Sequence, residues 1–147
     1  MATVTDASKV TSDLNDLIQL DYDAIAAYEA AIERLDNAAY KQQLTEFLGD
    51  HRRHIEELTQ AVRGVGGDPA TKGDAKKLLT KGKVVLADLA GDKAILSAMK
   101  SNEEQTNSEY EKAVKKGYEA SIQTILERGL ADERRHKAWI EQTLDRL

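Results

Sequence analysis

The fold is decided by residues 44–60, LTEFLGDHRRHIEELTQ, together with their counterpart at 126–142, LERGLADERRHKAWIEQ. The two stretches align without a gap at an offset of 82 positions, and both carry an Asp, two Arg and a His in the same order. The same offset pairs Tyr28 with Tyr110, so the repeat extends beyond these stretches. Because apolar residues in both copies recur at helical spacing, the repeat predicts a duplicated helical hairpin packed about a pseudo-two-fold axis.

Composition favours helices throughout the chain. The 147 residues are 41% hydrophobic and 32% charged, with a single Pro, which suits one all-α domain spanning 1–147. The apolar stripes predict an antiparallel four-helix bundle in which two hairpins are joined by one long crossover. The predicted helices cover about 9–35, 38–63, 93–116 and 119–146, and the predicted crossover covers 64–92, with a short helix over Ala75 to Leu89.

Charge and cysteine content exclude several classes of function. The net charge of -5, with basic and acidic residues intermixed, argues against nucleic acid as a partner. The absence of cysteine excludes disulfides and thiolate metal ligation. No apolar run reaches the length of a membrane span, so we expect no membrane partner and a cytoplasmic location.

Polar side chains interrupt every inner stripe at positions where apolar ones are expected. Burying several carboxylates in one layer is unfavourable unless a cation lies between them. Carboxylate oxygen combined with imidazole nitrogen suits iron, manganese or zinc. The alternative is a metal-free polar core, because each of these residues alone is a weak signal. The predicted ligands are Asp21, His51, His54, Glu103, Glu133 and His136.

Four further side chains lie near these positions: Tyr28, Tyr110, Asp50 and Asp132. The tyrosines lie on the same stripes as the acids and either hydrogen-bond to the site or serve as core aromatics. The aspartates either orient a histidine ring or pair with surface arginines. The arginine pairs at 52–53 and 134–135 point away from the stripes and are assigned to a solvated face.

The helix-one string Leu14-Asn15-x-Leu17-x-x-x-Asp21-x-x-Ala24-Ile25-x-x-Tyr28 resembles that of bacterioferritin, and Asp132-Glu133-x-x-His136-x-x-Trp139-Ile140 is similar to the corresponding ligand helix. Both bacterioferritin and rubrerythrin belong to the ferritin-like superfamily, in which two helices give one Glu each and two give Glu-x-x-His to a di-iron centre. This chain departs from the pattern, since His51 replaces a bridging Glu and Asp21 replaces a Glu.

The resemblance implies a ferritin-like protein that binds two metal ions, iron first, with manganese or zinc as alternatives. It implies iron oxidation, peroxide reduction or metal sequestration, with oxygen or peroxide as reactant and a homodimer as the assembly. Haem is not expected, because Arg52 occupies the position of the haem methionine. The alternative is a non-catalytic stress-response or interaction module whose polar layer is a structural metal site or a metal-free polar core. By resemblance, Glu133 bridges the ions, Asp21 and Glu103 are terminal ligands, and His54 and His136 cap one ion each. His51 either takes the vacant bridge position or swings free.

Overall fold

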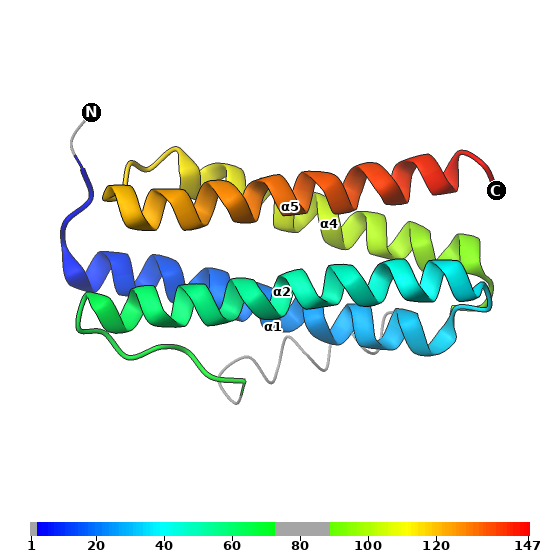
Figure 1. Cartoon of the computed structure of the whole chain (residues 1–147), viewed down its shortest axis with the longest axis horizontal. Helices are drawn as coiled ribbons and strands as arrows, with labels where there is room; N and C mark the ends of the chain where they lie inside the picture. The colour runs from blue at the N-terminus through cyan, green and yellow to red at the C-terminus, as the bar shows by residue number, and fades with distance from the viewer. Residues whose placement is uncertain (1–2, 73–88) are drawn as a thin grey trace.

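The computed structural model describes residues 3–72 and 89–147. These residues form four helices: α1 (Ala7–Arg34), α2 (Ala38–Gly64), α4 (Asp92–Val114) and α5 (Ala120–Leu144). The helices α1 and α2 form one antiparallel hairpin and α4 and α5 form the other, while α1 packs on α4 and α2 on α5 (Figure 1). The predicted all-α four-helix bundle of two hairpins is confirmed. The short helix predicted over Ala75 to Leu89 lies almost wholly outside the described residues.

Local capping fixes where the first hairpin begins and turns. The Asp6 side chain accepts hydrogen bonds from the backbone N–H of Ser8 and Lys9, so α1 begins two residues before the predicted position. At the turn, the Asn37 side chain caps α2. The Asp92 carboxylate accepts from the backbone N–H groups of Asp36 and Asn37 at 2.8 and 3.1 Å. Because Asp92 opens α4, these bonds align the two hairpins lengthwise.

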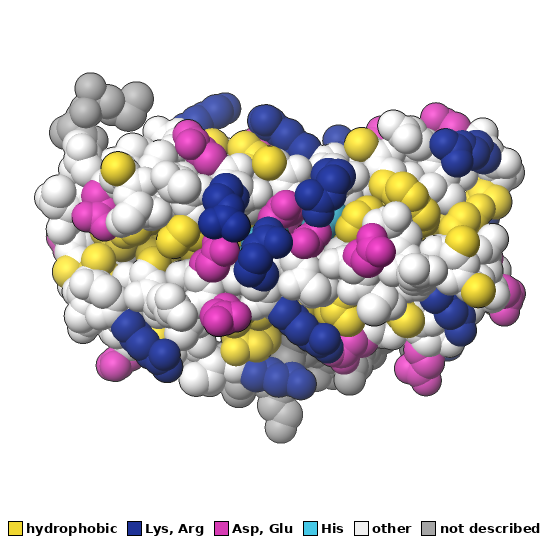
Figure 2. Space-filling view, viewed as in Figure 1, with side chains coloured by type: hydrophobic (Ala, Val, Ile, Leu, Met, Phe, Trp, Pro, Cys, Tyr) yellow, Lys and Arg dark blue, Asp and Glu magenta, His cyan; other side chains and the backbone are white. Residues whose placement is uncertain are grey.

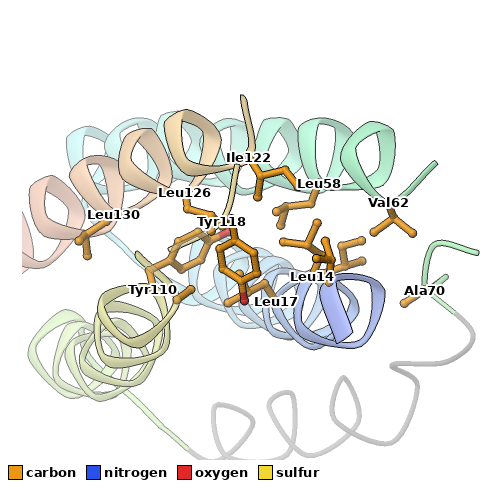
Figure 3. Close-up of a cluster of buried hydrophobic side chains, with 13 residues drawn as sticks. Leu14, Leu17, Leu58, Val62, Ala70, Tyr110, Tyr118, Ile122, Leu126 and Leu130 are labelled. Atoms are coloured by element: carbon orange, nitrogen blue, oxygen red, sulfur yellow. The ribbon is translucent and has the colours of Figure 1, made fainter. Parts of the chain in front are cut away.

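Two hydrophobic clusters fill the bundle, one toward each end. One contains Leu14, Leu58 and Leu126 from three helices and is shown in Figure 3. The other contains Leu44 and Met99 and lies nearer the turn between α1 and α2. A layer of buried polar side chains separates the clusters, so water is excluded from it along the bundle axis. No described helix combines the length and apolar character that crossing a membrane requires.

Candidate metal centre

All six side chains that the sequence predicts as ligands are buried, each with at most 3% of its surface exposed. Their nitrogen and oxygen atoms converge in two groups, and within each group the atoms lie within 4.8 Å of one another. The first group is Asp21, His51, His54 and Glu133, and the second is His51, Glu103, Glu133 and His136. The predicted residues are therefore brought together, and His51 and Glu133 belong to both groups.

The first group has nearly the dimensions of a tetrahedral metal site. Asp21 Oδ1 lies 2.8 Å from His51 Nδ1 and 3.2 Å from His54 Nδ1. Glu133 Oε1 lies 3.4 Å from His51 Nδ1 and 3.5 Å from His54 Nδ1. A tetrahedron with metal–ligand bonds of about 2.0 to 2.1 Å has edges of about 3.3 to 3.4 Å. Three of the four distances lie close to such an edge, and the distance from Asp21 Oδ1 to His51 Nδ1 is shorter.

The second group is slightly wider. Glu103 Oε1 lies 3.5 Å from His51 Nε2 and 3.4 Å from His136 Nδ1. Glu133 Oε2 lies 3.9 Å from His136 Nδ1. Glu133 therefore directs one oxygen to each group, which is the orientation of a carboxylate shared between two cations.

The outer nitrogens of two histidines are held by aspartates from the opposite repeat. His54 Nε2 lies 2.9 Å from Asp132 Oδ2, and His136 Nε2 lies 2.8 Å from Asp50 Oδ2. Each hydrogen bond fixes the ring so that Nδ1 faces the polar layer. A carboxylate behind the ring also raises the basicity of a ligating imidazole. Of the two roles considered for these aspartates, contact with a histidine ring is therefore present in the structure.

Arg53 and Arg135, assigned from the sequence to a solvated face, have side chains that are 38% and 57% exposed, and both also contact these aspartates, so the second role considered for the aspartates is present as well. Arg53 donates to Asp132 and, from Nη1 at 3.2 Å, to Asp50. Arg135 donates to Asp50 and, from Nη1 at 3.1 Å, to Asp132. Because α2 and α5 lie side by side, each arginine contacts one aspartate of its own helix and one aspartate of the other helix. Figure 2 shows the resulting mixture of basic and acidic side chains over the middle of α2 and α5.

The tyrosines hydrogen-bond to the acids of the layer, again across the repeats. Tyr110 Oη donates to Asp21 Oδ2 at 2.6 Å, and Tyr28 Oη donates to Glu103 Oε1. Both rings are almost fully buried. Each acid thus has one oxygen occupied by a tyrosine, which restrains its orientation within the layer.

The ring of Tyr110 packs directly against Gly129 of α5. A methyl group on Gly129 would lie 2.5 Å from Tyr110 Cε1, whereas one on the helical, exposed Gly49 would meet nothing within 4 Å. Alanine raises helix propensity by about 1 kcal/mol over glycine. We expect Gly49→Ala to stabilise the protein by about that amount. Gly129→Ala should instead destabilise it by about 1 to 2 kcal/mol, because overpacking outweighs propensity.

Urea denaturation of the two variants beside the parent protein measures this difference. Gly49 is the matched control, since it is also a mid-helix glycine and its equivalent in the second repeat is Ala131. If Gly129→Ala were as stable as Gly49→Ala, the close packing of Tyr110 on α5 would be incorrect.

Two residues that contact the predicted ligands, Thr106 and Asn107, were missed from the sequence. Thr106 Oγ1 donates to Glu133 Oε2 at 2.7 Å and also lies 3.1 Å from Glu103 Oε2. Asn107 Nδ2 donates to the backbone carbonyl oxygens of Glu103 and Glu133 at 2.7 and 3.0 Å. Their spacing of three and four residues from Glu103 was the available signal, because it places them on the same helix face.

The acids of the layer differ in their readiness to ionise. Burial raises the pKa of Asp21, but the charge of His54 and the hydrogen bond with His51 outweigh burial and lower it. Burial likewise opposes ionisation of Glu103, yet its contacts with His136 and His51 bring its pKa well below the usual range. For Glu133, burial and the charge of Glu103 prevail over the charge of His51, so its pKa is raised well above the usual range.

Two histidines of the layer hold protons more tightly than usual. Burial lowers the pKa of His51, but the charge of Glu133 and the hydrogen bond with Asp21 raise it well above the ordinary value. For His54, burial is outweighed by the charge of Asp21 and the hydrogen bond with Asp132, which raise its pKa to about 9. In the absence of metal, protons therefore compensate the buried carboxylates.

Three buried atoms of the layer have no hydrogen-bond partner in the described part of the chain: His51 Nε2, Glu133 Oε1 and His136 Nδ1. Each belongs to a predicted ligand and faces one of the two groups. Unsatisfied buried nitrogen and oxygen atoms are rare in folded proteins and cost about 1 to 3 kcal/mol each. A cation coordinated by these atoms would satisfy them, so the donor set fits a metal site.

Comparison with known families identifies the chain. A family model described as a domain of unknown function (DUF2383) matches residues 9–116. The chain belongs to this family. The matched region includes α2 and α4, so the DUF2383 domain contains at least Asp21, His51, His54 and Glu103 of the polar layer. No curated protein matches the chain.

Two solved structures have the same fold. A bacterioferritin-related protein from Bacteroides fragilis, described as a dodecameric thioferritin, is 17% identical with a TM-score of 0.81, and the match covers 95% of this chain and 86% of that one. A protein from Bacillus anthracis described as ferritin-like and diiron-carboxylate is 19% identical with a TM-score of 0.72, covering 98% and 99%. The predicted ferritin-like fold is therefore confirmed.

Proposed function

We propose that this chain binds two transition-metal ions in the polar layer of its ferritin-like bundle. The observation that carries the proposal is the convergence of six buried ligands in which three ligand atoms lack any hydrogen-bond partner among the described residues. These atoms have no hydrogen bond from the described residues, whereas most other ligand oxygens and nitrogens are held by neighbouring side chains. Iron is the first candidate, supported by the diiron-carboxylate description of the similar Bacillus anthracis protein.

The ligand roles follow from the two groups. Asp21 and His54 would hold one ion and Glu103 and His136 the other. Glu133 and His51 face both groups and would be shared. Three carboxylates and three histidines carry less negative charge than four carboxylates and two histidines, which keeps manganese and zinc as alternatives.

We propose redox chemistry at this site, with the surrounding residues holding its ligands in place. Bound metal ions would supply electron transfer and polarise an oxygen species, so iron oxidation or peroxide reduction is the proposed reaction class. Asp132 and Asp50 hold the histidine rings in the ligating orientation. Thr106 donates to the shared Glu133 and keeps one of its oxygens aimed at the second group. Self-association is also proposed, supported by the dodecameric state of the Bacteroides fragilis protein.

A second candidate function is a non-catalytic helical module with a metal-free polar core. It is favoured by the hydrogen bonds between His51, His54 and Asp21 and by the raised pKa of both histidines, because protonated rings neutralise the buried acids. The two candidates differ in metal content. Elemental analysis of protein purified without a metal-affinity tag distinguishes them.

Anaerobic titration with ferrous ion tests the leading proposal. We expect two ions per chain in the parent and one in either His54→Ala or His136→Ala, since each histidine serves a different group. Arg134→Ala is the matched control, because this exposed side chain neighbours Glu133 in sequence and should leave the stoichiometry at two. A parent protein that binds no ferrous, manganous or zinc ion would contradict metal binding and favour the polar core.

A further inference from the structure

The two repeats differ at the centre of the polar layer. His51 and Glu133 occupy equivalent positions, 82 residues apart, yet one is an imidazole and the other a carboxylate. The His51 ring lies between the other two histidines, with centroids 5.5 Å from His54 and 5.2 Å from His136. It is also fully buried, and Tyr28 packs against it at a centroid distance of 5.2 Å. The ring is therefore held in a fixed central position.

The two nitrogens of His51 face different ligand groups. Nδ1 lies 2.8 Å from Asp21 Oδ1, whereas Nε2 lies 3.5 Å from Glu103 Oε1. Nε2 has no hydrogen-bond partner among the described residues, although it is completely buried. By contrast, His54 and His136 each direct one nitrogen outward to an aspartate and offer only Nδ1 to the layer. His51 alone among the three histidines offers both nitrogens inward.

We infer that His51 bridges the two ions, with Nδ1 bound to one and Nε2 to the other; this inference rests on the proposed metal-binding function. The imidazole loses its second ring proton to water as both nitrogens coordinate. The nitrogens point away from each other across the five-membered ring. With metal–nitrogen bonds of about 2.0 to 2.1 Å, a bridging imidazole holds two ions about 6 Å apart.

This spacing differs from that of ordinary dinuclear sites, in which the ions lie about 3.5 to 4 Å apart. Glu133 is compatible with the wider spacing, because its two oxygens are directed to separate groups, with Oε1 at 3.5 Å from His54 Nδ1 and Oε2 at 3.9 Å from His136 Nδ1. At about 6 Å, a single oxygen atom cannot bind both ions, since each metal–oxygen bond spans only about 2.0 to 2.2 Å. The centre therefore favours reactants that approach one ion at a time.

Crystals of the zinc-loaded full chain test the bridge, with the separation read from anomalous diffraction at the zinc edge. We expect two zinc peaks about 6 Å apart in the parent. The matched variant His51→Glu, which restores the carboxylate of the second repeat, should bring them to about 3.5 to 4 Å. Both values are distances, so the readout does not depend on any catalytic activity.

The outcomes separate the two proposals. Two peaks at about 3.5 to 4 Å in the parent overturn the His51 bridge and leave the two-ion proposal intact, whereas a single peak overturns both the bridge and the second ion. No zinc in the parent, together with no bound ion in the ferrous titration, overturns metal binding itself. If His51→Glu fails to fold, the parent separation still decides the question.

Discussion

Removing bound metal from this protein should lower its melting temperature by about 10 °C. Ions that bind the folded layer and not the unfolded chain, at a free concentration about 30 times the dissociation constant, stabilise the fold by about 2 kcal/mol each, so two ions contribute about 4 kcal/mol. For a chain of this size, each kcal/mol corresponds to about 2 to 4 °C. The stabilisation arises because His51 Nε2, Glu133 Oε1 and His136 Nδ1, which are buried and unpartnered, gain a cation.

Thermal unfolding followed by circular dichroism, before and after chelation, measures the shift. Metal content is determined on the same samples, so that a null result is not caused by incomplete removal. The double variant His54→Ala/His136→Ala is the control, because it lacks one terminal ligand in each group and should unfold at the same temperature with or without metal. An unchanged melting temperature in a chelated parent of verified composition would favour the metal-free polar core.

The helices and the predicted ligands were accessible from the sequence because each depends on one periodic pattern. An apolar stripe defines the inner face of each helix, and a polar residue on that stripe must lie in the interior. Asp21 and Glu103 were identified in this way, and both are fully buried. The constant offset between the repeats then placed them at the same height in the bundle.

The contacts around the predicted ligands could not be predicted from the sequence in the same way. Asp132 reaches a histidine of the other repeat, and Arg53 reaches an aspartate across the seam between α2 and α5. Such pairs depend on the distance between two helices and on their rotation. The apolar pattern of one helix does not determine either quantity. For the same reason Gly129 gave no signal, because its role is defined by the ring of Tyr110 on a neighbouring helix.

The first residue of α1 also could not be predicted from the apolar stripe alone. The stripe predicted a beginning near residue 9, whereas the helix begins at Ala7. The apolar pattern records only residues that face the core, and the first turn of this helix is exposed apart from Val10. The capping side chain of Asp6, not the stripe, determines the boundary.

The metal-free protein should lose stability as the pH rises from about 6.5 to 10. His54 has a pKa of about 9 in the folded state, raised by the charge of Asp21 and the hydrogen bond with Asp132 against the effect of burial. In the unfolded chain its pKa is about 6.5. The folded state therefore binds the proton more tightly, so this stabilisation is complete below pH 6.5 and is lost as the pH rises through about 9.

The expected loss from His54 is about 3 kcal/mol, since each pKa unit corresponds to about 1.4 kcal/mol. The pKa of His51 is raised in the same direction, so its deprotonation adds to the loss. At low pH, Asp132 makes stability depend on pH in the opposite direction. Its pKa is lowered to about 2 by its contacts with His54, against the effect of burial. Its contribution is present above pH 3.8 and is lost as the pH falls through about 2.

Bound metal should abolish the loss of stability at alkaline pH. Coordination requires deprotonated ring nitrogens, so the ions replace the protons of His51 and His54, and their affinity increases as the pH rises. The stability of the loaded protein should therefore change little between pH 7 and 10, while that of the chelated protein falls by about 3 kcal/mol. The difference between the two forms is largest where protons can no longer compensate the buried charges of Asp21 and Glu103.

Urea denaturation at pH 6.5, 8 and 10, with and without chelator, measures both curves. His54→Gln is the matched control, because its amide keeps a donor near Asp21 and Asp132 without a titrating charge, so its chelated form should lose less stability over this range. A chelated parent whose unfolding free energy is constant from pH 6.5 to 10 would show that protonated His54 does not stabilise the layer. The buried acids would then be compensated by something other than the histidine protons.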